Sequence, residues 1–116
     1  MSVWKWNDVE LEIDMEDLDF QERYENAFEI MEEEEKEVKK AGRLSELTRA
    51  YCDMFYHLFD HIFGEGTGEK LFQGKRNARM VDDCYESFLG CCQKDVIALN
   101  KNRTSRFKKF HVVRKS

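Results

Sequence analysis

A glycine-rich segment with basic neighbours is the first candidate for chemistry. Residues 63–77, FGEGTGEKLFQGKRN, contain four of the six glycines in this chain of 116 residues. A phosphate-binding loop of the pattern GxxxxGK[ST] surrounds a phosphate with backbone amides and a lysine, and its hydroxyl binds Mg²⁺. Here Gly68 and Gly74 are one residue too far apart, and Arg76 follows Lys75 where Ser or Thr belongs. A dinucleotide-binding loop needs a preceding strand, whereas the pattern here predicts a helix.

The same segment fits a structural bend between two helices. Gly64 is placed to end the helix before it, and residues 67–72, TGEKLF, can form one short helical turn. Gly74 can end that turn. Leu71 and Phe72 then fix the bend to the core. The sequence therefore favours a connection between helices over a nucleotide site.

Two histidines have the spacing of metal ligands. His57 and His61 are four residues apart, as are two zinc ligands on the helix of many metalloproteases. Those enzymes place a glutamate directly after the first histidine, and Leu58 stands there in this chain. Asp53 and Asp60 could complete a site. The alternative is a pair of partly exposed histidines beside an aromatic stripe, so His57 and His61 are weak metal candidates.

The cysteines and carboxylates show no catalytic pattern. The four cysteines are Cys52, Cys84, Cys91 and Cys92. The last two are adjacent, so they form neither a CxxC redox pair nor half of a zinc site. We expect free thiols in a reducing compartment. No GxSxG motif is present. The sequence predicts a protein that acts by binding, without a cofactor and without catalysis.

Charge is distributed unevenly along the chain. The net charge is −5, but residues 1–40 hold fifteen acidic and five basic residues, a balance of −10. Residues 96–116 hold seven Lys or Arg and no acid. Such a chain could associate head to tail or use its two ends on different partners, although solvated acidic helix faces and basic tails are also common. Phe107 and Phe110 interleave with the basic residues, a pattern that could touch nucleic acid, but the acidic body would repel phosphates.

The elements that must position these residues begin with a hairpin. Residues 3–14, VWKWNDVELEID, alternate apolar and polar residues on both sides of a two-residue turn. This register pairs Trp6 with Val9 and Trp4 with Leu11, and it places Lys5 opposite a glutamate. An isolated hairpin is marginal in water. Its apolar face is therefore expected to cover the chain's own helices.

Three longer segments have helical periodicity, over about residues 17–40, 44–63 and 77–100. The second carries a wide apolar stripe: Leu44, Leu47, Tyr51, Met54, Phe55, Leu58, Phe59 and Ile62. The predicted fold is mostly α, with an N-terminal β-hairpin and about three amphipathic helices in one domain over residues 1–99. Residues 100–116 are expected to form a basic tail, either flexible or with a short strand in FKKFHVV. No signal peptide or membrane span is expected, so we expect the chain in the cytoplasm where it is made.

VWKWNDVELEID and IFGEGTGEKLFQGKRN resemble sequences in small proteins from the tail-gene modules of siphophages and prophages of Gram-positive bacteria. The resemblance covers residues 3–99. Within such modules, proteins of this size and helical makeup are similar to tail assembly chaperones. The resemblance implies binding to the tape-measure protein in the host cytoplasm, self-association along it, and release as tail-tube subunits polymerise. The strongly basic end departs from that pattern.

Aromatic residues are the candidates for contact with such a client. Trp4, Trp6, Phe55, Phe59 and Phe72 belong either to the core or to a client groove, with the core favoured for Phe55 and Phe59. The partner-binding candidates are therefore Trp4, Trp6, Phe72, Phe107 and Phe110.

Two other functions stay open. One is a structural virion component, such as a head-tail connector or tail protein. The other is an acidic phage protein that inhibits a host nucleic-acid-binding protein through residues 32–35, EEEE.

Overall fold

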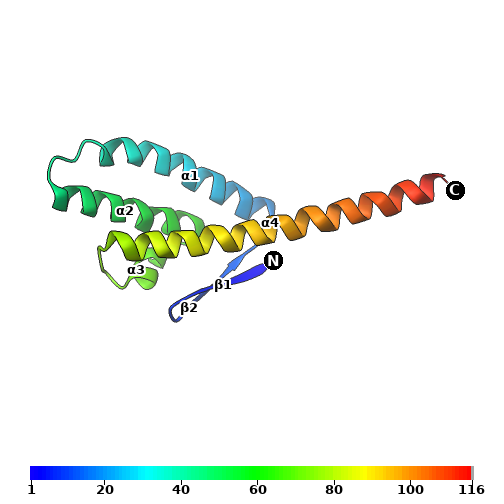
Figure 1. Cartoon of the computed structure of the whole chain (residues 1–116), viewed down its shortest axis with the longest axis horizontal. Helices are drawn as coiled ribbons and strands as arrows, with labels where there is room; N and C mark the ends of the chain where they lie inside the picture. Colours follow the sequence, from blue (N-terminus) through cyan, green and yellow to red (C-terminus); the bar gives the residue numbers. More distant parts are fainter. Residues whose placement is uncertain (116) are drawn as a thin grey trace.

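A computed structural model describes the backbone of residues 1–115 and the side chains of residues 1–106. The elements, in order, are β1 (Ser2–Trp6), β2 (Val9–Ile13), α1 (Leu18–Val38), α2 (Leu44–Phe63), α3 (Thr67–Phe72) and α4 (Ala78–Lys115). Figure 1 shows α1 and α2 as an antiparallel pair, with α4 alongside α2 and the hairpin packed beneath α4. The prediction of a mostly α fold with an N-terminal hairpin is confirmed.

The hairpin has the predicted register. Trp6 pairs with Val9, Trp4 with Leu11 and Lys5 with Glu10. The Lys5 ammonium lies 3.4 Å from the Glu10 carboxylate on the outer face. The turn places Asn7 at a φ of 53°, in the left-handed region that asparagine tolerates better than most residues. The apolar face packs on the chain's own helices, as expected.

The helices begin and end where local chemistry allows. The Asp17 carboxylate accepts a hydrogen bond from the Phe20 amide at 3.0 Å and so caps α1. The Asn77 side chain caps α4 in the same way, through the Met80 amide at 3.0 Å. Gly64 ends α2 with a φ of 118°, which a residue with a Cβ rarely adopts. These three residues explain why the sequence predicted the helix boundaries closely.

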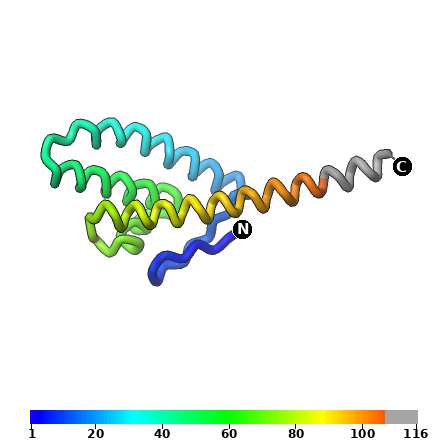
Figure 2. The backbone as a smooth tube through the Cα atoms, in the orientation of Figure 1, coloured from blue at the N-terminus to red at the C-terminus, as the bar shows by residue number. Residues whose placement is uncertain are grey.

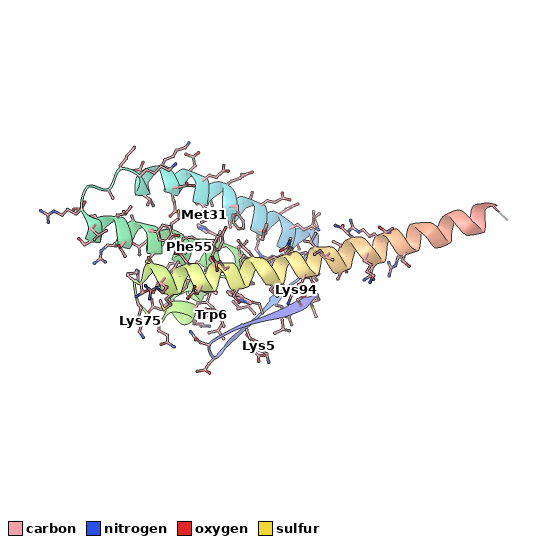
Figure 3. The ribbon with its side chains drawn as sticks, in the orientation of Figure 1. Lys5, Trp6, Met31, Phe55, Lys75 and Lys94 are labelled. Atoms are coloured by element: carbon pink, nitrogen blue, oxygen red, sulfur yellow. The ribbon has the colours of Figure 1, made fainter. Side chains whose placement is uncertain are left out.

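The core is an aromatic cluster centred on α2. Phe59, on α2, contacts Trp4 of β1, Phe72 of α3 and Phe88 of α4, with ring centroids 5.5, 5.8 and 5.3 Å apart. All four rings are buried, as is Phe55. Met31 of α1 is partly buried and packs against the same core, and Figure 3 labels it with Phe55 of α2. Through Phe59, α2 therefore contacts β1, α3 and α4.

The predicted end of the third long helix near Asn100 is wrong. α4 continues to Lys115 and includes the residues for which a tail or a short strand was expected. The reason is local, because no glycine or proline follows Gly90. Figures 1 and 2 show α4 extending past the hairpin, and the molecule measures 68 × 31 × 22 Å along its principal axes. We call residues 100–115 the α4 arm.

The opposite end of the molecule exposes apolar residues. Leu44 and Leu47 begin the apolar stripe of α2, yet their exposed fractions are 80% and 40%. The stripe is buried only where α2 lies against other elements, and its first turn is beyond them. Among the described residues, no helix is both long enough and apolar enough to cross a membrane.

Candidate interaction surfaces

The glycine-rich loop uses its backbone amides within the protein. The Gly68 amide donates to Asp60 Oδ1 at 2.8 Å, and the Lys75 amide donates to the Phe72 carbonyl at 3.0 Å. Gly68 also lies against α2, because a Cβ built there would be 2.8 Å from the Cα and carbonyl oxygen of Tyr56. The loop therefore holds α3 on α2, as the structural interpretation predicted.

The basic residues of this loop are also used structurally. The Arg76 guanidinium lies over the Tyr56 ring at 3.9 Å from its centroid, and its Nε–H donates to Asp53 Oδ1 at 2.7 Å. The Tyr56 hydroxyl donates to the Lys75 carbonyl at 2.7 Å. The carboxylate of Asp53 raises the pKa of Arg76 further above its usual range. These contacts tie the loop between α3 and α4 to the face of α2.

The histidine pair does not gather a metal-ligand set. His57 Nδ1 lies 2.7 Å from Glu34 Oε2 on α1, while His61 is exposed. Asp53 and Asp60, the proposed additional ligands, bind Arg76 and the Gly68 amide instead. Across the part of the chain that the structure describes, no three His, Cys, Asp or Glu side chains are grouped to hold a metal ion.

Two of the partner-binding candidates lie in the core. The exposed fraction is 3% for Trp4 and 0% for Phe72. Trp4 stacks on Phe59, and its indole N–H donates to Ser87 Oγ at 3.0 Å. The chain itself covers both rings, so contact of Trp4 and Phe72 with a partner stays a prediction that their burial does not support. Trp6 is half-buried and keeps part of its surface free.

The cysteines are free thiols that fill space. Cys52, Cys84 and Cys92 are buried, and Cys91 is half-buried. Burial raises the pKa of the Cys84 and Cys92 thiols to about 12, so both stay protonated near neutral pH. Neither thiol is therefore a nucleophile.

Sequence reasoning missed a carboxylate that holds the hairpin on α4. Asp95 is only 5% exposed and accepts hydrogen bonds from the Ser2 hydroxyl at 2.6 Å and the Met15 amide at 2.8 Å. Burial alone would raise its pKa, but these hydrogen bonds and the nearby α-amino group outweigh burial and lower the pKa. The signal was present, because residues 84, 88, 92 and 95 fall on one helical face.

An acidic stripe follows the exposed side of α1. Glu22, Glu25, Glu29 and Glu32 recur at spacings of three and four residues, and all four are exposed. None of them has a cation within 4 Å among the described residues, whereas Glu33, Glu35 and Glu37 pair with lysines at the C-terminal end of α1 and just beyond it. The acidic stripe is therefore free to attract a basic partner.

The α4 arm offers the opposite charge. Lys101, Arg103 and Arg106 are exposed on it and have no ion-pair partner within the described residues. The candidates Phe107 and Phe110 belong to the arm, but their side chains lie outside the described residues. The arm and the acidic stripe thus lie on different helices of one molecule, and no ion pair joins them among the side chains of residues 1–106.

The comparisons give a family and no functional relative. Residues 7–116 match the model of DUF6673, described as a family of unknown function. No curated protein and no solved structure matches the chain.

Proposed function

We propose that this chain, which belongs to the DUF6673 family, is a phage tail assembly chaperone. In this proposal it binds the tape-measure protein in the host cytoplasm and keeps it soluble while the tail is built. The α4 arm carries the proposal, because every side chain described on it is exposed and the helix projects from the rest of the molecule. The resemblance of residues 3–99 to tail-module proteins supplies the client.

The physical requirements of such a chaperone agree with the surfaces. A protein that holds a long helical client needs adaptable contacts and enough charge to stay dissolved. The arm presents a basic helical surface, which suits acidic stretches of a helical client. The exposed Leu44 and Leu47 offer apolar contacts at the other end of the molecule. Binding at both ends would spread a client along the full length of the chaperone.

Co-expression with a tape-measure protein tests the proposal. Light scattering coupled to size-exclusion chromatography should show a large soluble complex that forms only when both proteins are made together. The double variant R103E/R106E should reduce recovery of that complex about tenfold or more, because it reverses two exposed charges of the arm.

The matched control is K36E/K40E, which makes the same change in net charge at the far end of α1. This variant should leave the complex intact, because these lysines pair only with glutamates of α1. A tape-measure protein that stays insoluble beside the unaltered chain would contradict the proposal, as would an equal loss of complex in both variants.

A structural virion component is the second candidate, and the elongated shape favours it. A length of 68 Å with a projecting helix suits a protein that bridges neighbouring subunits. The two candidates differ in the finished particle. A component would remain in purified virions at a fixed ratio to the tail-tube protein, whereas a chaperone would be absent from them.

A further inference from the structure

Strand β1 has a free edge. Among the described residues the sheet has two strands, so β1 pairs with β2 alone. In a hairpin with a two-residue turn, the pair beside the turn is hydrogen-bonded and the pairs then alternate. Val3 and Lys5 belong to the pairs without mutual hydrogen bonds, so their N–H and C=O groups face away from β2. No other hydrogen bond to these groups occurs within the described residues.

The free edge opens onto a groove beside α4. The groove has a volume of about 460 Å³, and its walls are β1 and one side of α4. The lining residues are Ser2, Val3, Trp4 and Lys5 from the strand and Glu86, Ser87, Gly90, Cys91 and Lys94 from the helix. An extended segment of three residues is about 10 Å long, so it can lie along the four residues of β1 that line the groove.

Gly90 leaves one position of α4 that lines the groove without a side chain. A Cβ built on this residue would meet no atom within 4 Å, so packing inside the chain does not require a glycine. Glycine in the middle of a helix is less favourable than alanine. The groove thus keeps open a position that a side chain could fill without a clash, and an approaching backbone needs such space.

The edge is held rigidly. Ser2 is bound to Asp95 at 2.6 Å, and Trp4 is bound to Ser87 at 3.0 Å. These contacts also show that β1 runs opposite to α4. A segment that pairs with β1 would therefore meet donors and acceptors that are already in place, which lowers the entropic cost of binding.

Opposite charges stand at the two ends of the groove. Lys94 and Glu86 both line the groove and are eight residues apart on α4, which is about 12 Å along the helix. Because Ser2 is bound to Asp95 and Trp4 to Ser87, Lys94 stands towards the Ser2 end of the groove and Glu86 towards the Lys5 end. Neither has an ion-pair partner within the described residues. About 12 Å corresponds to roughly four residues of extended chain. A segment that satisfies both would carry an acidic residue at one end and a basic residue four positions away.

We propose that the groove between β1 and α4 binds an extended segment of a partner protein as a third strand, antiparallel to β1. The backbone of the segment pairs with Val3 and Lys5, its acidic residue meets Lys94 and its basic residue meets Glu86. A second copy of β1 would fit less well, because antiparallel pairing would bring its Lys5 toward Lys94. This binding is separate from the helical client contact of the α4 arm and does not depend on it.

Nuclear magnetic resonance with a designed peptide tests the proposal. The probe is acetyl-Lys-Val-Thr-Val-Glu-amide, which has no net charge and places Lys and Glu four residues apart. Its addition to the ¹⁵N-labelled full chain should shift the amide signals of Val3 and Lys5 and slow their hydrogen exchange about tenfold or more. The same peptide with alternate N-methyl groups cannot complete the ladder and should cause neither change.

Two variants localise the site. Gly90→Leu should fold at least as stably as the unaltered chain and lose peptide binding, because its side chain fills the groove. Gly42→Leu is the matched control, since a Cβ at Gly42 also meets no atom within 4 Å. Lys94→Glu should weaken binding about twofold to fivefold, the usual value of one exposed ion pair.

Unchanged signals for Val3 and Lys5 at millimolar peptide would overturn the proposal. Equal binding by Gly90→Leu and the unaltered chain would overturn it too. Signal changes confined to the α4 arm would place the peptide elsewhere and count against the groove.

Discussion

At the scale of single residues, Asp95 connects both ends of the hairpin to α4. Its carboxylate accepts one hydrogen bond from Ser2 at the start of β1 and another from the Met15 amide just after β2. A buried carboxylate is costly unless its oxygens are satisfied, and here they are. The hairpin is therefore fixed in position by polar contacts as well as by the burial of Trp4 and Ile13.

Replacement of Asp95 by Asn should destabilise the fold by about 1–3 kcal/mol at neutral pH, because one oxygen becomes a donor that faces either the Met15 N–H or the Met1 ammonium, which lies 3.3 Å from Oδ1. Urea unfolding with tryptophan fluorescence measures this, since Trp4 is buried in the same region. Ser45→Ala is a matched control, because that exposed polar residue of α2 makes no side-chain hydrogen bond within the described residues. Loss of stability in that control equal to the loss in the Asp95 variant would contradict this role.

The lowered pKa of Asp95 also predicts a pH dependence. The unfolded chain has the higher pKa, near 3.9, so below that value it binds more protons than the folded chain and stability falls with falling pH. The contribution of Asp95 is complete above about pH 5 and is lost as the pH drops through the folded value. The difference in unfolding free energy between the unaltered chain and Asp95→Asn should therefore be constant from pH 5 to 7 and shrink below about pH 4. A difference that grows at acid pH would contradict the assignment.

At the scale of elements, α3 is attached to α2 by close backbone contact. Gly68 lies where any side chain would enter the backbone of Tyr56. Its amide donates to Asp60 Oδ1, so the same residue makes the close contact and a hydrogen bond to α2. The short helix has six residues and would not persist alone in water. Its position depends on this approach and on the burial of Leu71 and Phe72.

Gly68→Ala should lower the unfolding free energy by about 1–3 kcal/mol, because the methyl group forces α3 away from α2. The thermal midpoint should fall by several degrees in a circular dichroism melt. Gly42→Ala is the control, as it adds a methyl group into open space and should be neutral or slightly stabilising. Equal thermal midpoints for both variants would show that α3 and α2 leave room for a methyl group at Gly68, which contradicts the close contact with Tyr56.

At the scale of the whole molecule, the separated charges favour head-to-tail association. The acidic stripe spans about 15 Å of α1 and the α4 arm about 24 Å, and their signs are opposite. Contact between the arm of one copy and the stripe of the next uses two different surfaces, so it can extend without closing. Self-association is expected from both the charge gradient and the resemblance to tail-module proteins.

Light scattering at low and high salt checks this expectation. The average mass should rise with protein concentration in about 50 mM salt and fall towards the monomer in about 500 mM salt, because screening weakens exposed pairs. R103E/R106E alone and E25K/E29K alone should each remain monomeric. Mixing the two variants should restore chains in which the variants alternate, because the unaltered arm of one meets the unaltered stripe of the other and the reversed charges match at the next contact. Combining all four changes in one polypeptide should restore association too, since the swapped signs again match. Association that strengthens with salt would indicate apolar contacts instead.

Residue patterns were sufficient to predict the local structure, except for the C-terminal extension of α4. Alternation around Asn7 predicted the hairpin and its register. Helical periodicity predicted helix starts near residues 17 and 77, where the side chains of Asp17 and Asn77 cap α1 and α4. The spacing of the glycines also argued against a phosphate loop and for a structural bend. Gly64 and Gly68 indeed have structural roles that need glycine. These features depend on neighbours within a few residues, so the pattern of residue types is sufficient to predict them.

Only the tertiary structure decided which surfaces are free. Trp4 and Phe72 could have faced a partner until their contacts with Phe59 were known. The role of Asp95 depends on Ser2, which is 93 positions away in the chain. The groove beside β1 likewise joins the first strand to the last helix. Burial and long-range hydrogen bonds depend on how elements pack, and a pattern that fixes each element's own faces does not determine which elements cover them.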